Sequence, residues 1–194
     1  NGSTTEDRTN YYEWGPATAL PLMLWLEADR MGWLLPTMTG EKVDLQRDVV
    51  KNERRQSFEN QPYGLWPELL ANELFPFGHP YSWSVIGSMA DLSASSLDDV
   101  QEFFRTYYTP NNLSLVIAGD FDPAAAKQLV EKYFGSLPPG PALARPKVAP
   151  VALAAGKTLE IADRVPQERV YMIWPTPPLY GAADVLVLPT VYDP

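Results

Sequence analysis

Residues 44–64, DLQRDVVKNERRQSFENQPYG, hold the side chains whose types and spacing most suggest chemistry. The segment is predicted to be a helix, although most of its residues are charged or amides. Gln46, Val49, Val50 and Glu53 recur at i, i+3, i+4 and i+7, so they share one helical face. A carboxylate therefore ends the only apolar stripe of this helix. A solvated helix would carry Glu53 on the other side, which makes this glutamate a candidate functional residue.

Other metal-binding or nucleophilic residue types are scarce. The chain contains no cysteine, which excludes disulfides and thiolate metal sites and leaves the compartment open. Its one histidine, His79, has no second histidine or glutamate at helical spacing, so this chain alone cannot supply a two-histidine metal site. Gly119 and Asp120 are expected to form a strand-to-helix turn, because no glycine pattern or lysine of a phosphate loop follows them.

The charge balance and the lengths of the apolar runs argue against some classes of partner. The 194 residues carry a formal charge of −9, whereas nucleic acid and anionic lipid both require a basic face. The longest apolar run, residues 19–36, is interrupted by Glu27, Asp29 and Arg30. Its uninterrupted part is much shorter than the roughly 20 residues of a membrane span. We therefore predict no span, and a core helix that begins near Pro21.

Further elements must position the candidate residues, and local signals predict them. The helices are predicted at residues 41–60, 65–75, 95–108 and 122–137, the last two capped by Ser96 and Asp122. The strands are predicted at residues 112–121, 157–163 and 169–177, and the tail from Ala182 is predicted to be helical. Mixed helices and strands without strict alternation indicate an α+β domain, whose mostly antiparallel sheet is covered by helices on one side.

The remaining features receive structural interpretations. Tyr11, Tyr12, Trp14 and Trp25 are expected to be core or partly buried aromatics, and the charged run at residues 53–55 is expected to continue as a solvated helix face. From the residues alone, the chain is an acidic α+β domain with one unusually placed glutamate. These observations name no reaction.

The chain is organised around a proline-rich segment. Residues 136–150 hold five prolines, which indicates an extended strap rather than an element. We expect one partial domain over residues 1–194, with a first part at 1–135, the strap at 136–156 and the start of a second part at 157–194. Both ends are expected to be internal to a longer chain, because the first residues are strand-like and the tail has no stop signal.

Four stretches together resemble the pitrilysin/insulinase family of zinc metallopeptidases, and the more divergent bacterial members in particular. They are NGSTTEDRTNYYE, QRDVVKNERRQ, PYSWSVIGSMADLSASSLDDVQEFFRTYYTPNN and LSLVIAGDFDP, which follow one another in the family's order. No single stretch is specific, but the combination is, and it covers most of residues 1–135.

The resemblance implies roles for residues of the charged helix. In the family, two histidines of an upstream HxxEH motif and a glutamate on a second helix bind zinc, and Glu53 matches that glutamate. The HxxEH motif is not among these residues, and His79 resembles a structural loop of the family. Many members carry another glutamate seven residues before the ligand, where this chain has Gln46. Gln46 is therefore expected to assist catalysis only by hydrogen bonding.

The resemblance also implies a substrate site. The family's edge strand beside the metal accepts an extended peptide as an additional strand, and Asn1, Gly2, Ser3 and Thr4 match its positions. Gly2 would allow a close approach of the substrate backbone. The alternative is that this segment is a plain strand or turn.

The whole is expected to be an internal piece of the N-terminal domain of a bacterial zinc metalloendopeptidase that cleaves peptides or small proteins. A second homologous domain or subunit is expected as its partner, and this chain alone is expected to bind no zinc tightly. One alternative is a non-catalytic family member that serves as a subunit of an active peptidase; another is a small-molecule binding domain. A periplasmic or cell-envelope location is expected, with the cytoplasm as the alternative.

Overall fold

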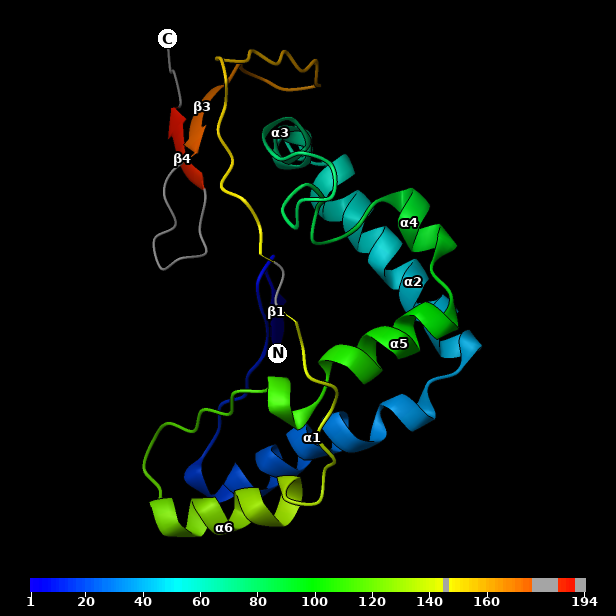
Figure 1. Ribbon diagram of the computed structural model, residues 1–194, viewed down its shortest axis with the longest axis vertical. Coiled ribbons are helices and arrows are strands. Elements are labelled where there is room, and N and C mark those ends of the chain that lie inside the picture. The colour runs from blue at the N-terminus through cyan, green and yellow to red at the C-terminus, as the bar shows by residue number, and fades with distance from the viewer. Residues whose placement is uncertain (145–146, 176–184, 191–194) are drawn as a thin grey trace. The chain divides into compact units, whose positions relative to one another are not determined.

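The computed structural model describes residues 1–144, 147–175 and 185–190, and Figure 1 shows its elements. The helices are η1 (Ala17–Ala19), α1 (Leu20–Trp33), η2 (Leu35–Thr37), α2 (Gly40–Arg54), η3 (Arg55–Glu59), α3 (Trp66–Leu74), α4 (Met89–Ala94), α5 (Leu97–Tyr107), η4 (Pro110–Asn112) and α6 (Pro123–Phe134). The strands are β1 (Gly2–Thr4), β2 (Thr9–Tyr11), β3 (Val170–Pro175) and β4 (Val185–Thr190). The chain divides into two compact units, one of residues 1–49 and 89–145, the other of residues 50–88 and 146–194.

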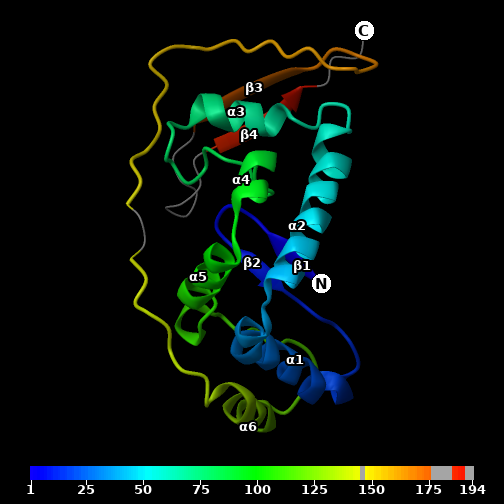
Figure 2. The same cartoon turned by 90° about the vertical axis from the view of Figure 1, so that its right-hand side faces the viewer.

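The core of the first unit lies where α1 packs against α6, and the two helices run side by side in Figures 1 and 2. Leu24 and Ala28 of α1 and Ala126 of α6 are buried. Pro21 stands in the first turn of α1, where its missing N–H costs nothing, so the predicted start of this helix is confirmed. None of the helices in the described residues is both long and apolar enough to cross a bilayer.

Both predicted helix caps are present. The Ser96 side chain accepts a hydrogen bond from the Asp99 amide, and the Asp99 carboxylate accepts one from the Ser96 amide, which forms a capping box. Hydrogen bonds from Ser96 hold the pKa of the Asp99 carboxyl below its usual range. Asp122 caps α6 by accepting from the Ala125 amide at 2.8 Å. Caps act within one turn, which explains why these boundaries are predictable.

The strands form two antiparallel two-stranded sheets, which agrees with the predicted α+β class. In the first unit β1 pairs with β2, and Figure 2 shows this hairpin. In the second unit β3 pairs with β4, and Trp66 of α3 stacks on Tyr171 of β3 with ring centroids 4.1 Å apart. Exposure along β3 alternates with a period of two, as in a sheet with one covered face.

Three element predictions were wrong. Within the described residues, the segments 112–121 and 157–163 form no strand, because their backbone has no neighbouring strand to pair with. Val116 is 84% exposed accordingly. The predicted helical tail contains the strand β4 instead, while residues 182–184 lie outside the described residues. A short apolar run does not distinguish a buried helix from a strand, and the pairing with β3 decides.

The predicted aromatic core is only partly formed. Tyr11, Tyr12 and Trp25 are 41 to 47% exposed, which fits partly buried rings, but Trp14 is 75% exposed. Trp14 stacks on Tyr12 with centroids 6.0 Å apart, so ring contact replaces burial at this position.

Candidate functional site

The charged helix forms as predicted and carries both candidate residues. α2 covers residues 40–54 and continues as the π-helical turn η3 to residue 59. Glu53 lies in the last turn of α2 and Gln46 two turns earlier, and both are exposed. Within the described residues, the Glu53 carboxylate makes no hydrogen bond or ion pair. Val49 of the apolar stripe is 50% exposed, so the stripe is not packed at this residue.

Arg54 fixes the end of this helix, although the sequence predicted a solvated face there. Its side chain is 7% exposed. Nε donates to Glu59 Oε1 at 3.0 Å, Nη2 lies 2.9 Å from Glu68 Oε2, and Nη1 donates to the Gly87 carbonyl at 2.6 Å. Burial lowers the pKa of Arg54, but hydrogen bonds to Glu68 and Glu59 outweigh it and the net pKa is raised. The guanidinium thus connects the end of α2 to η3, α3 and the loop before α4. Because Arg54 directly follows Glu53, these contacts fix the backbone next to Glu53.

The turn after η3 requires a glycine. A Cβ built on Gly64 would lie 1.9 Å from the Phe58 carbonyl oxygen, which no side chain can tolerate. The preceding residue, Tyr63, has a φ of 61°, in the left-handed region that non-glycine residues rarely adopt. The sequence QPYG therefore ends the helical segment as predicted, by backbone approach and not by proline alone. π-helical turns occur often at functional sites, and this one begins two residues after Glu53.

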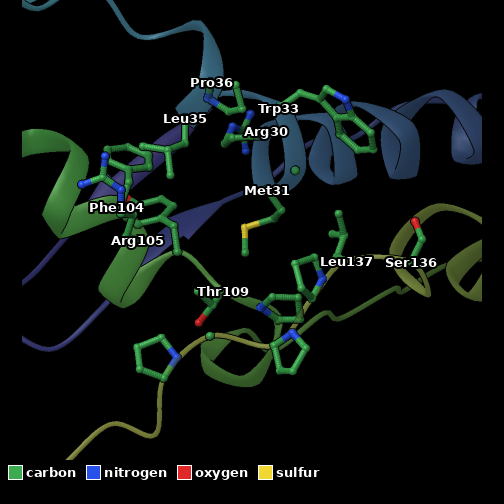
Figure 3. A pocket seen from close by; sticks show the side chains of 17 residues that line it. Arg30, Met31, Trp33, Leu35, Pro36, Phe104, Arg105, Thr109, Ser136 and Leu137 are labelled. Carbon is green, nitrogen blue, oxygen red and sulfur yellow. The ribbon is translucent and has the colours of Figure 1, made fainter.

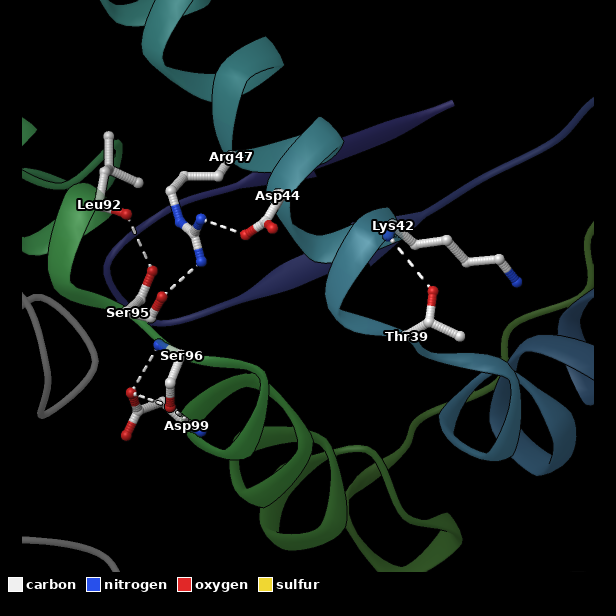
Figure 4. A network of polar contacts seen from close by, with 8 residues as sticks. All are labelled: Thr39, Lys42, Asp44, Arg47, Leu92, Ser95, Ser96 and Asp99. Atoms are coloured by element: carbon white, nitrogen blue, oxygen red, sulfur yellow. Dashed lines mark hydrogen bonds and ion pairs between the residues drawn. The ribbon is translucent and has the colours of Figure 1, made fainter.

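Arg47, the neighbour of Gln46, anchors the first half of α2 within the first unit (Figure 4). It makes an ion pair with Asp44 one turn earlier, and its Nη2 donates to the Ser95 carbonyl at 2.6 Å. The Ser95 carbonyl lies just before the capped start of α5. Arg47 directly follows Gln46, and Arg54 directly follows Glu53. These two arginines therefore hold α2 in place, while the candidate residues themselves stay exposed.

His79 belongs to a packed loop. It is 6% exposed, stacks on Phe75 with centroids 4.6 Å apart, and its Nδ1 accepts from the Tyr81 amide at 3.0 Å. This geometry agrees with the predicted structural loop. Among the described residues, no group of three or more histidine, aspartate and glutamate side chains could hold a metal ion.

A cavity of about 660 Å³ lies in the first unit, between the end of α1, the end of α5 and the strap at residues 136–141 (Figure 3). Asn111 fastens the strap, because its Oδ1 accepts from the Gly140 amide at 2.7 Å and its Nδ2 donates to the Pro141 carbonyl at 3.1 Å. The two cations of the lining are already neutralised: Arg30 is paired with Glu27, and Arg105 lies 3.5 Å from Glu102. The cavity suits an apolar group and assembles no catalytic set.

The chain is similar to known peptidases. The sequence model of the peptidase M16 inactive domain matches residues 95–189. A zinc protease of Helicobacter pylori, PqqE, is 33% identical over 137 residues, which cover 71% of this chain and 30% of the relative. An uncharacterized zinc protease of Mycobacterium tuberculosis is 30% identical, with 70% and 30% covered. Subunit beta of the mitochondrial-processing peptidase of Caenorhabditis elegans is 24% identical, with 72% and 30% covered.

One solved structure is similar as well. The crystal structure of a protease from Helicobacter pylori matches with a TM-score of 0.64 and 29% identity, covering 71% of this chain and 33% of that chain. The chain belongs to the pitrilysin/insulinase family, peptidase family M16. It spans about a third of the length of the relatives that it matches.

The structure brings the expected site residues into two places, without testing their roles. Glu53 and Gln46 lie on α2, while Asn1 to Thr4 lie in or beside β1, and these roles stay predictions. Arg54 was not predicted as a functional residue. Its signal in the sequence is its place at i+4 from Val50, on the side of the stripe, but its partners lie up to 33 residues away.

Proposed function

We propose that this chain is the part of a zinc metalloendopeptidase that supplies one zinc ligand, Glu53, and the strand edge to which a peptide or small-protein substrate adds. One observation supports the proposal above the others. The Glu53 carboxylate is exposed and without a partner in the described residues, while the adjacent Arg54 side chain is buried and bound by three acceptors. A held backbone with a free carboxylate is what a metal ligand requires.

The chemistry of Glu53 fits zinc, but only as one member of a set. One glutamate and two imidazoles bind zinc and leave a position open for water, and the resemblance assigns the imidazoles to an HxxEH helix of the full-length protein. Bound zinc lowers the pKa of that water and polarises the scissile carbonyl. Glu53 contributes a negative charge at a fixed position. With one ligand, the 194-residue chain alone is expected to bind zinc weakly.

Gln46 is proposed to act at a distance from the metal. Seven residues along a helix correspond to about 10.5 Å, which is too far for coordination by both side chains. A neutral amide can orient a neighbouring group by hydrogen bonding but cannot transfer a proton as a carboxylate does. Gln46 therefore tunes the site without holding zinc.

The pairing of β1 identifies the backbone groups that a substrate would meet. The Asn1 nitrogen donates to the Tyr12 carbonyl at 3.1 Å, and the Tyr12 amide donates to the Asn1 carbonyl at 3.0 Å. Antiparallel pairs alternate between hydrogen-bonded and non-bonded, so Ser3 also bonds across the hairpin. Gly2 and Thr4 thus direct their N–H and C=O groups to the other edge. We propose that a substrate strand pairs with these two residues.

The ligand proposal is tested in the full-length protein by Glu53→Gln. Zinc content and hydrolysis of a quenched peptide should both fall by more than tenfold, because an amide is a poor ligand and one of three protein ligands is lost. Asp48→Asn is the matched control, since it neutralises another exposed carboxylate of α2 and should change neither. Gln46→Ala should retain zinc and reduce turnover only modestly. Wild-type zinc and turnover in Glu53→Gln would make this glutamate a surface residue.

A second candidate function is a non-catalytic subunit or partner of an active peptidase. The match to the inactive domain of the family supports it, as does Gln46 in place of a glutamate. This candidate predicts a full-length protein that contains no zinc and hydrolyses no peptide until it is mixed with an active partner. A zinc content near one per chain, with hydrolysis by the protein alone, excludes it.

A second homologous domain or subunit completes the proposal, since a substrate strand needs a facing surface that excludes water. The chain's relatives include a protein named as a subunit of a processing peptidase.

We also propose a periplasmic or cell-envelope location, with the cytoplasm as the alternative. Cell fractionation followed by detection of the protein distinguishes the two.

A further inference from the structure

The β1–β2 hairpin needs an anchor outside itself. Each strand has three residues, and an isolated two-stranded hairpin is marginally stable at best in water. Tyr11 of β2 stands directly opposite Gly2 of β1. Its hydroxyl lies 2.9 Å from the hydroxyl of Tyr108, at the end of α5, and the two rings meet edge to face with centroids 6.3 Å apart. The hairpin is therefore joined to a helix 97 residues later.

Both sides of this contact are held in place. The Arg30 guanidinium of α1 lies over the Tyr11 ring, 4.0 Å from its centroid, and is itself paired with Glu27 of the same helix. Tyr108 stacks on Phe104 with centroids 4.1 Å apart. Tyr11 thus has α1 on its ring and the end of α5 at its hydroxyl. All five residues belong to the first unit.

We propose that Tyr11 is a positioning residue for the substrate strand: through its contacts with Tyr108 and Arg30 it orients the outward backbone groups of Gly2 and Thr4. The inference rests on the proposed function, because it takes β1 as the strand to which the peptide adds. Backbone hydrogen bonds weaken steeply away from 2.7–3.2 Å, so roughly 1 Å of hairpin movement would disrupt substrate pairing. Burial and the bond to Tyr108 raise the pKa of Tyr11 to about 12, so the hydroxyl stays protonated well above neutral pH.

The hairpin offers a matched control. Tyr12 follows Tyr11 directly, is 47% exposed, and its hydroxyl makes no hydrogen bond within the described part of the chain. Its ring contacts Trp14 instead of a helix. Tyr12→Phe therefore removes the same atom from the same hairpin without touching the contact with Tyr108.

The experiment uses the full-length protein with four variants: Tyr11→Phe, Tyr108→Phe, the double variant and Tyr12→Phe. Two quantities are measured, the hydrogen exchange of the amides in residues 1–12 and the KM and kcat for a quenched peptide. A lost hydrogen bond of about 1 kcal/mol corresponds to about fivefold. We expect about fivefold faster exchange and a fivefold higher KM in each single tyrosine variant of the pair, with kcat and zinc content near wild type. The double variant should match the singles, and Tyr12→Phe should match wild type.

Several results would overturn the inference. Unchanged exchange in Tyr11→Phe means that the hydroxyl does not hold the hairpin. Faster exchange with an unchanged KM means that the hairpin is held but does not present the substrate edge. Equal effects in Tyr12→Phe mean that any hydroxyl loss disturbs the hairpin. A wild-type protein without peptidase activity refutes the proposed function, and the positioning role with it; failure of the inference alone appears only in variants of an active wild type.

Discussion

Arg54→Met removes a buried positive charge but keeps an apolar side chain of similar length to the arginine stem at this position. The side chain is 7% exposed and its guanidinium meets three acceptors. Removing one partner of a buried ion pair costs about 3–5 kcal/mol, whereas a surface pair contributes about 0–1 kcal/mol. The side chains of Glu59 and Glu68 are 33% and 24% exposed, so water can partly resolvate them. We therefore expect a loss of about 2–3 kcal/mol in the local stability of η3 and α3.

The assay is native-state hydrogen exchange of the amides in η3 and α3, because a chain of two units has no single unfolding free energy. The neighbouring arginine is the control. Arg55 is exposed and donates to Asn52 Oδ1 at 2.8 Å, so Arg55→Met should cost about 0.5 kcal/mol or less. Arg54→Lys should lie between the two, since an ammonium keeps the charge but cannot reach three acceptors in the same geometry.

A double variant separates charge pairing from packing. Arg54→Met with Glu68→Met replaces both partners by apolar side chains, and it should cost less than the sum of the two single substitutions. In the full-length protein, Arg54→Met should also weaken zinc binding, because the turn that carries Glu53 loses its anchor. Equal losses of protection in η3 and α3 for Arg54→Met and Arg55→Met would contradict this prediction.

Three further predictions concern the strand edge, the hairpin and a helix cap. Gly2→Ala should leave the hairpin intact, because the added Cβ would lie at an ordinary 3.4 Å from its nearest atom, the Asn10 carbonyl oxygen. If a substrate backbone approaches Gly2 closely, the same substitution should raise KM severalfold in a quenched-peptide assay. The pKa of Tyr11 is raised to about 12, so the stabilisation by its protonated hydroxyl is complete below pH 10 and is lost as the pH rises through about 12. Amide hydrogen exchange of the hairpin, corrected for intrinsic rates, should show this loss in wild type and not in Tyr11→Phe. Ser96→Ala should cost α5 about 1 kcal/mol, measured by amide exchange, and should raise the pKa of the Asp99 carboxyl toward its usual value, measured by NMR titration.

Elements that depend on neighbouring residues were predictable from the sequence. Ser96 and Asp122 cap helices through atoms three residues away, so their signals lie within a short window. The strand at residues 112–121 was predicted from residue types that favour strands, and it does not form in the described structure. Strand propensity describes a fit to neighbouring strands, and among the described residues no strand pairs with this segment. Local preference without a partner is therefore a weak guide to strands.

The candidate site shows the same division between local and distant information. The stripe that singles out Glu53 follows from helical periodicity, and the helix forms where the sequence predicted it. Helical periodicity places Arg54 at i+4 from Val50, on the side of the stripe, and Arg55 on the opposite side, but the partners that bury Arg54 are Glu68 and Gly87, 14 and 33 residues further on. Tyr11 and Tyr108 meet across 97 residues in the same way. A candidate ligand can thus be found by its spacing, whereas the residues that hold it in place are found only once the chain is folded.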